Sequence, residues 1–260
     1  MPSFTEFFLV RGALSATAAL LLTVAGGSAQ SVDKLLKEGS VFDGKFQAVA
    51  ALKFYLAAEK LEPNDPRVLV RIARQYRHLM VDATTNEEKL RLGRVALQYA
   101  QKATALAPNL AEAQLSVAIT YGKLLPLMSR KEQVETSMRI KNAVDRALAL
   151  DPRSDLAWHV LGRWHRVLAD VSGLKRMLAG AVYGSLPKGS NEEAARCLQK
   201  AVDLNPTRPM HYIELGRVYA QMGREDDARR FIAKGLAMPN VDKDDDETKA
   251  RGRVTLAQLR

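Results

Sequence analysis

Residues 212–219 read YIELGRVY, and related octets occur at three earlier places: LVRIARQY at 69–76, QLSVAITY at 114–121 and WHVLGRWH at 158–165. In every copy the first position is large or amphipathic, the fourth is aliphatic, the fifth is alanine or glycine, and the eighth is aromatic or histidine. These four positions share one face of an α-helix. Because the small fifth residue lets another helix approach closely, the octet predicts a helix that packs against a second helix.

A proline-containing turn precedes each octet. The four turns read KLEPND at 60–65, ALAPNL at 105–110, ALDPRS at 149–154 and DLNPTR at 203–208. Proline cannot continue a helix, so each turn ends one helix and begins the next. Apolar residues recur at three- and four-residue steps almost throughout, and alternating β-branched runs are absent. We therefore expect an all-α protein.

Each octet, with the residues that follow it, resembles the tetratricopeptide repeat. That repeat has a large residue, a leucine–glycine pair and a tyrosine on one helix, then alanines on a second helix, then proline. The matching second-helix residues are Ala96, Ala100 and Ala103; Ile140, Val144 and Ala147; Ala194, Leu198 and Ala201; and Ala228, Ile232 and Gly235. The resemblance implies a right-handed α-solenoid of four tetratricopeptide-like helix pairs.

The spacing within the pairs is uneven. Tyr212 precedes Ala228 by 16 residues, as in an ordinary repeat of about 34 residues. The earlier separations are 27 from Leu69 to Ala96, 26 from Gln114 to Ile140 and 36 from Trp158 to Ala194. We expect these inter-helix insertions to lengthen helices and their connections. The third, at 171–190, is amphipathic and basic before it becomes rich in glycine and proline, which predicts a short extra helix and a loop.

The first residues differ in composition from the rest of the chain. Arg11 is followed by the uncharged run GALSATAALLLTVAG, which is shorter than the ~20 residues that cross a bilayer as a helix. Gly27 and Ala29 have the small-residue spacing of a signal-peptidase site. We predict a signal peptide at 1–29 and export to the periplasm or medium; the alternative is an uncleaved membrane anchor. A short helical segment at 30–60 and a repeat domain at 61–260, with a capping helix near 245–259, complete the organisation.

Four further stretches are distinctive: RIARQYRHL at 71–79, HVLGRWHRVLAD at 159–170, SLPKGSNEEAARCLQKAVDLNP at 185–206 and VDKDDDETKARGRVTLAQL at 241–259. They resemble the regulator of microtubule dynamics protein family, a group of tetratricopeptide-like proteins. The resemblance implies an all-α fold without assigned enzymatic activity. It also implies, as an alternative function, a membrane-tethered or microtubule-associated organiser.

The tryptophans and histidines of 157–165 are expected to pack rather than to bind a ligand. Trp158 and His165 are seven residues apart, two helical turns, and so share the packing face. His159 points about 120° away from His165, so the two cannot chelate one ion from a regular helix. Lone Cys197 is expected to be a buried small hydrophobe, and the acidic run 242–247 is expected to cap the last helix. We expect no catalytic residues, metal or cofactor.

Basic residues recur at corresponding positions of the octets, and the formal net charge is +10. First helices line the concave surface in repeats of this type, and the residues that lie five and eight positions after the first residue of each octet are expected to be exposed there. The predicted groove residues are Arg67, Arg74, Arg77, His159, Arg163, Arg166 and Arg217. Guanidinium groups bind carboxylates through paired hydrogen bonds, so these residues predict a groove for an acidic peptide. The alternative is a solvated face, or internal pairing to glutamates such as Glu112 and Glu214.

The sequence therefore predicts a non-catalytic scaffold that binds a protein or acidic peptide. Nucleic acid is not expected as a partner, because it fits less well with basic residues that are not interleaved with exposed aromatic residues, and no small-molecule substrate is expected. A competing hypothesis is an enzyme whose insertion at 171–190 closes over a pocket lined by His159, Arg163 and Lys175. Contact with a membrane is expected only if the N-terminal segment stays uncleaved.

Overall fold

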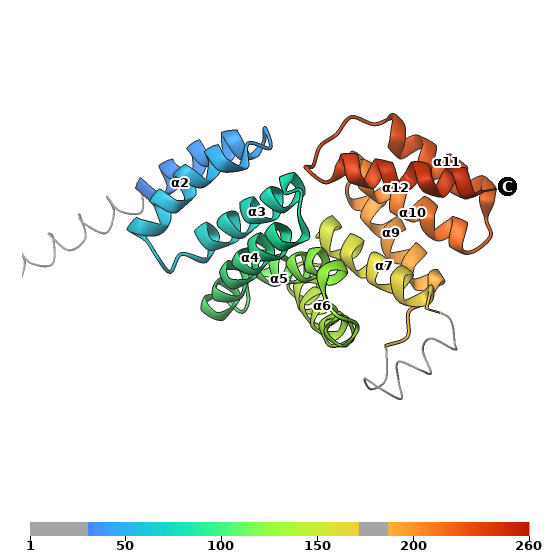
Figure 1. The fold of residues 1–260 in the computed structure, drawn as a ribbon, viewed down its shortest axis with the longest axis horizontal. Helices are drawn as coiled ribbons and strands as arrows, with labels where there is room; N and C mark the ends of the chain where they lie inside the picture. The colour runs from blue at the N-terminus through green and yellow to red at the C-terminus, as the bar shows by residue number, and fades with distance from the viewer. Residues whose placement is uncertain (1–30, 172–186, 260) are drawn as a thin grey trace, which may run out of the picture.

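The computed structural model describes residues 31–171 and 187–259, and all regular secondary structure within these ranges is helical (Figure 1). The predicted signal peptide and most of the predicted insertion at 171–190 lie outside the described residues.

The helices follow one another with short connections. A helix at 31–43 comes first. It is followed by α2 (Ala48–Leu61), α3 (Pro66–Asp82), α4 (Asn86–Leu106), α5 (Ala111–Leu124), the 3-10 turn η1 (Leu125–Leu127), α6 (Arg130–Leu150), α7 (Asp155–Ala169), α9 (Asn191–Leu204), α10 (Pro209–Gln221), α11 (Glu225–Ala237) and α12 (Asp245–Gln258).

The recurring prolines end helices as predicted. In each turn the alanine five residues before the proline accepts the last helical hydrogen bond, at 2.8–3.0 Å: Ala58 from Glu62, Ala103 from Ala107, Ala147 from Asp151 and Ala201 from Asn205. Side chains then cap the helices that follow. Asp65 accepts from the backbone N–H of Arg67 at the start of α3, and Ser154 accepts from that of Ala157 at the start of α7.

Consecutive helices pack as pairs, which confirms the expected tetratricopeptide-like fold. The closest partners are α3 with α4, α5 with α6, α7 with α9, and α10 with α11, while α12 covers α10 and α11. A Cβ on Gly162 would lie 2.6 Å from Leu198 on the paired helix, and one on Gly216 would lie 2.6 Å from Ile232. The fifth position of the octet is therefore small because the second helix crosses there.

The extra residues of the first two repeats lengthen their second helices. Helices α4 and α6 each have 21 residues, whereas α11 has 13. Only residues 83–85 separate α3 from α4, so almost all of the first insertion is helical. A capping box between Ser129 and Glu132 begins α6.

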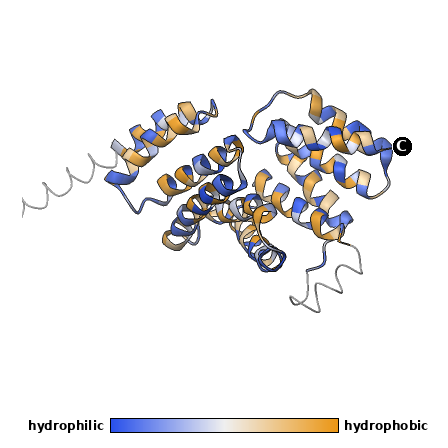
Figure 2. Cartoon of the chain, viewed as in Figure 1, coloured by the Kyte–Doolittle hydropathy of each residue, from blue (hydrophilic) through white to orange (hydrophobic). Residues whose placement is uncertain are grey.

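Hydrophobic and hydrophilic residues alternate along the helices (Figure 2), and the buried apolar residues form clusters between packed helices. Trp158 packs against the cluster formed by α5, α6 and α7, as predicted. Trp164 is the more buried tryptophan, and its indole N–H donates to the carbonyl of Ser137 on α6 at 2.8 Å. The ring of His165 packs edge-on against Trp164. This part of 157–165 is therefore helix packing.

Candidate interaction surface

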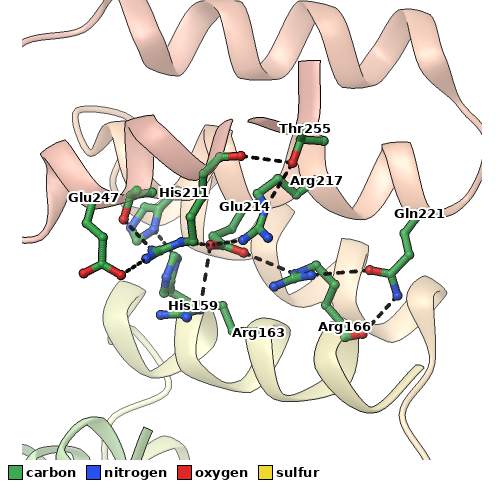
Figure 3. A network of polar contacts seen from close by, with 11 residues as sticks. His159, Arg163, Arg166, His211, Glu214, Arg217, Gln221, Glu247 and Thr255 are labelled. Carbon is green, nitrogen blue, oxygen red and sulfur yellow. Dashed lines mark hydrogen bonds and ion pairs between the residues drawn. The ribbon is translucent and has the colours of Figure 1, made fainter. Parts of the chain in front are cut away.

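A buried carboxylate on α10 organises the arginines of the C-terminal half (Figure 3). Glu214 is 0% exposed. Arg217 on the same helix donates to its Oε1 at 2.9 Å, and Arg166 on α7 donates to its Oε2 at 3.2 Å. Arg163 on α7 and Arg251 on α12 approach Oε1 at 3.8 and 3.7 Å. These four guanidinium groups and Glu214 are called the Glu214 cluster below.

The Glu214 cluster joins three helices. Arg166 also donates to Gln221 at 3.4 Å, and Arg217 donates to Thr255 on α12 at 3.3 Å. Burial alone would raise the pKa of the Glu214 carboxyl, but the arginines hold that pKa well below its usual range. The carboxylate therefore stays ionised and fixes α7 and α12 against α10.

A second buried chain of polar groups lies beside this cluster. Nδ1 of His211 on α10 is 3.0 Å from Nδ1 of His159 on α7, and Nε2 of His211 is 3.0 Å from Asp155. Arg208 reaches the same carboxylate oxygen at 2.9 Å. Burial lowers the pKa of both imidazoles, which favours their neutral forms.

The expectation that His159 is exposed in the groove is wrong, because the ring of His211 covers it and leaves it 2% exposed. The same burial removes His159 from the pocket that the enzyme hypothesis requires. Lys175, the third residue of that pocket, lies outside the described residues.

The predicted arginines of the N-terminal half also have partners within the chain. Arg67 pairs with Asp65 at 2.7 Å and with Asp33 at 3.0 Å. Arg74 lies 3.5 Å from Asp43, at the end of the 31–43 helix. Arg77 is 7% exposed and donates to Ser116 and Thr120 on α5, at 2.8 and 3.2 Å.

The predicted residues are therefore divided among several contacts rather than gathered in one open row. Arg77 and Arg166, which directly follow their octets, connect a first helix to the first helix of the next pair. Of the others, Arg74 and Arg163 keep side-chain exposures of 37% and 42%. The arginines that recur at corresponding positions of the first helices thus mainly make contacts within the protein, and in the C-terminal half they pair with Glu214.

Sequence reasoning missed the connection between α11 and α12, residues 238–244, which we call the acidic connection. In Figure 1 it reaches from the C-terminal helices toward the end of α3. Asp244 pairs with Lys123 on α5 at 2.6 Å, and Lys243 pairs with Asp82 on α3 at 2.6 Å. Asp242 lies 3.5 Å from Arg208. An acid–base–acid stretch of the chain therefore lies against charges on α3, on α5 and at the start of α10.

Local hydrogen bonds hold the acidic connection in this path. Asp245, at the start of α12, accepts from the backbone N–H groups of Val241 and Asp242, both at 2.8 Å. Lys249 donates to the carbonyl of Met238. The expected capping role thus falls to Asp245–Glu247, which form the first turn of α12, while Asp242 and Asp244 face other helices. The signal for this was the alternation of charge at 242–244.

The acidic connection lies in a basic environment. Burial acts to raise the pKa of the Asp244 carboxyl, but Lys123, His78 and Arg163 lower that pKa overall. Burial lowers the pKa of Arg77 to about 10, a shift that Arg74 increases and that Asp244 and Asp242 oppose. Carboxylates at 242 and 244 therefore interact electrostatically with cations from α3, α5 and α7.

Other kinds of site have little support in the part of the chain that the structure describes. Within residues 31–171 and 187–259 no cluster of histidine, cysteine and acidic residues could hold a metal ion. None of the described helices combines the length and the apolar character needed to cross a membrane. Cys197 is fully buried, and burial raises the pKa of its thiol to about 11, so it is not an activated nucleophile.

Stacked helix pairs, with a small residue at each crossing and polar contacts between consecutive first helices, define a tetratricopeptide-like helical repeat protein. Known structures agree on the fold. A thermophilic tetratricopeptide-repeat protein of Thermus thermophilus superposes with a TM-score of 0.63 at 20% identity, over 87% of this chain and 99% of that chain. The Pseudomonas aeruginosa pilF structure gives a TM-score of 0.51 at 16% identity, over 90% and 93%.

The chain belongs to the regulator of microtubule dynamics protein 1-3 family, whose model matches residues 29–260. Regulator of microtubule dynamics protein 1 of Mus musculus is 24% identical over 79% of this chain and 68% of its own length. Protein 2 of Bos taurus is 22% identical over 69% of this chain and 44% of its own length. Protein 3 of Xenopus laevis is 25% identical over 69% of this chain and 39% of its own length. The chain therefore spans less than half the length of these last two relatives.

Proposed function

We propose that this protein is a non-catalytic interaction scaffold that binds an acidic segment of a partner protein on the surface formed by the first helices of its pairs. The observation that carries the proposal is the acidic connection, in which the carboxylates of Asp244 and Asp242 pair with Lys123 and Arg208. A surface that accepts carboxylates of its own chain has the charge and shape for those of another. The extended inner surfaces of helical repeat proteins commonly bind partners.

Cations that stay accessible on this surface support the proposal. Arg71 and Arg74 on α3 have side-chain exposures of 39% and 37%, and each lies only at the edge of pairing distance from Asp43, at 3.9 and 3.5 Å. Lys123 on α5, the first helix of the next pair, is 19% exposed and pairs with Asp244. Long-range attraction of an acidic segment by such a patch speeds association and weakens with added salt.

Fluorescence anisotropy with a labelled decapeptide of alternating aspartate and glycine tests the proposal, with the asparagine counterpart as the neutral probe. We expect the wild-type chain to bind the aspartate peptide and the Arg74→Gln/Lys123→Gln variant to bind it about tenfold more weakly, as expected for the loss of two charge-assisted contacts.

The matched control is Arg91→Gln/Arg196→Gln. It removes two exposed arginines from the second helices α4 and α9, each paired with a glutamate one turn away, and it should bind like the wild type. Equal binding by all three proteins, or no preference for aspartate over asparagine, would refute the proposal.

Family membership favours a second candidate, microtubule association, since the matched relatives are named as regulators of microtubule dynamics. Cosedimentation with polymerised tubulin tests it. We expect binding that is lost when the acidic carboxyl-terminal tails of tubulin are removed by limited proteolysis. Pelleting that does not depend on polymerised tubulin would exclude this candidate.

We also propose that residues 1–29 direct export, on the basis of their sequence alone. Amino-terminal sequencing of the mature protein tests this. A start near Gln30 supports export, and a start at residue 1 or 2 supports a membrane anchor instead. Export and microtubule association are mutually exclusive, so this measurement also discriminates between the two candidate functions.

A further inference from the structure

The acidic connection occupies the surface to which we assign partner binding. Asp244 and Lys123 come from positions 121 residues apart in sequence, and their ion pair is only 19–26% exposed at the side chains. Lys243 and Asp82 form a second pair over a still larger sequence separation, at 2.6 Å. These contacts link the end of the solenoid to its first tetratricopeptide-like pairs across the surface formed by the first helices.

Three features distinguish these contacts from ordinary surface ion pairs. They join elements that do not pack extensively on one another, since the described contacts of α12 are mainly with α10 and α11. They alternate in sign along consecutive residues, so Asp242, Lys243 and Asp244 each face a charge of opposite sign. The two long-range pairs also involve the first helices α3 and α5 rather than the second helices α4 and α6.

We infer that the acidic connection is an internal competitor for the partner site: residues 242–244 bind in cis where an acidic partner segment binds in trans, so a partner must displace them. The inference rests on the proposed function. It specifies the partner segment further, as a short stretch that can form a turn and that has carboxylates two residues apart, the spacing of Asp242 and Asp244 in the turn before α12. Displacement leaves α12 in place, because α12 packs against α10 and α11 of the last pair.

A competitor within the chain reduces apparent affinity by the fraction of molecules whose site is open. Removing the two carboxylates should therefore strengthen binding of an external acidic peptide. Asp242→Asn/Asp244→Asn in the full chain should bind the aspartate decapeptide at least about tenfold more tightly than the wild type, which corresponds to about 1.4 kcal/mol.

The matched control is Asp203→Asn/Asp226→Asn, which removes the same charge from positions on α9 and α11 outside the acidic connection. This control should bind like the wild type, which separates displacement from a general change in net charge.

Hydrogen exchange measured by mass spectrometry on the wild-type chain provides a readout that needs no variant. The amides of Val241 and Asp242 are bonded to Asp245 in the occupied state. Saturating aspartate peptide should accelerate exchange across 238–244 and leave the amides of α5 and α10 no faster than before.

The outcomes separate the two ideas. If the peptide binds wild type and Asp242→Asn/Asp244→Asn equally, or binds while 238–244 keeps its protection, the internal competitor is refuted and the scaffold proposal stands. If none of the proteins prefers the aspartate peptide to the asparagine peptide, the scaffold proposal fails and the competitor with it.

Discussion

Replacing Glu214 by glutamine tests whether one buried carboxylate holds the C-terminal pairs together. The substitution keeps the shape of the side chain and removes its charge, leaving Arg163, Arg166, Arg217 and Arg251 without their shared counter-ion. Removing one partner of a buried ion pair costs about 3–5 kcal/mol. Because the arginine side chains keep exposures of 12–42%, water compensates part of this, and we expect a loss of about 2–4 kcal/mol in unfolding free energy.

The dependence on pH follows from the lowered pKa of Glu214. A carboxylate whose folded-state pKa lies below its ordinary value of 4.5 contributes stability that is present above pH 4.5. This contribution is lost as the pH falls toward the folded-state pKa. The difference in stability between wild type and Glu214→Gln should therefore be constant near neutral pH and shrink progressively below pH 4.5.

Urea unfolding followed by far-UV circular dichroism measures both effects. Glu193→Gln is the control, since Glu193 forms an exposed pair with Arg196 at 45% and 61% side-chain exposure, and its loss should cost less than about 0.5 kcal/mol. A change in Glu214→Gln no larger than in Glu193→Gln would refute the reasoning, as would a difference that grows in acid.

Three further predictions concern packing, histidine ionisation and the thiol. Gly216→Ala should destabilise the protein by about 1–3 kcal/mol, because the new Cβ would lie 2.6–3.0 Å from Ile232 and from backbone of α11. Gly122→Ala, with open space around the new Cβ, should stabilise the protein by about 0.5–1 kcal/mol. Urea unfolding that ranks the two variants in the opposite order would contradict the packing geometry. Burial lowers the pKa of His159 below 6.5, so the unfolding free energy of the wild type should fall as the pH drops below 6.5. The unfolding free energy of His159→Asn should fall less over the same range. Parallel pH profiles of the two proteins would count against this. Cys197 should not react with a thiol reagent at about pH 8 in the native protein and should react fully in denaturant; fast native labelling would show that it is accessible.

The helix pairs could be predicted from sequence because the contacts that define them are local and repeated. Ala73, Ala118, Gly162 and Gly216 occupy the same octet position and are all buried where helices meet, so the pattern is readable within a short window. The proline-containing turn before each octet marks the start of the same helix independently. The lengthening of α4 and α6 was also expected from the spacing between the pairs.

The arrangement of charges could not be predicted in the same way. Glu214 is the third residue of its octet and has no acidic equivalent in the other copies, so its burial depends on arginines supplied by three helices. His159 looked accessible because its neighbour, His211, lies 52 residues away. The acidic connection is paired with Lys123 across 121 residues, a separation at which sequence periodicity carries no information.

The acidic connection also restricts how this architecture can vary. A stack of helix pairs is open at both ends, and units can in principle be added to it or removed from it. Here Lys243 and Asp244, near the last pair, form ion pairs with Asp82 and Lys123 in the first two pairs. The distance that these contacts span is set by the number of pairs between them. Inserting or deleting one helix pair would move these residues out of contact. The contacts therefore constrain the number of pairs and the curvature of the solenoid together.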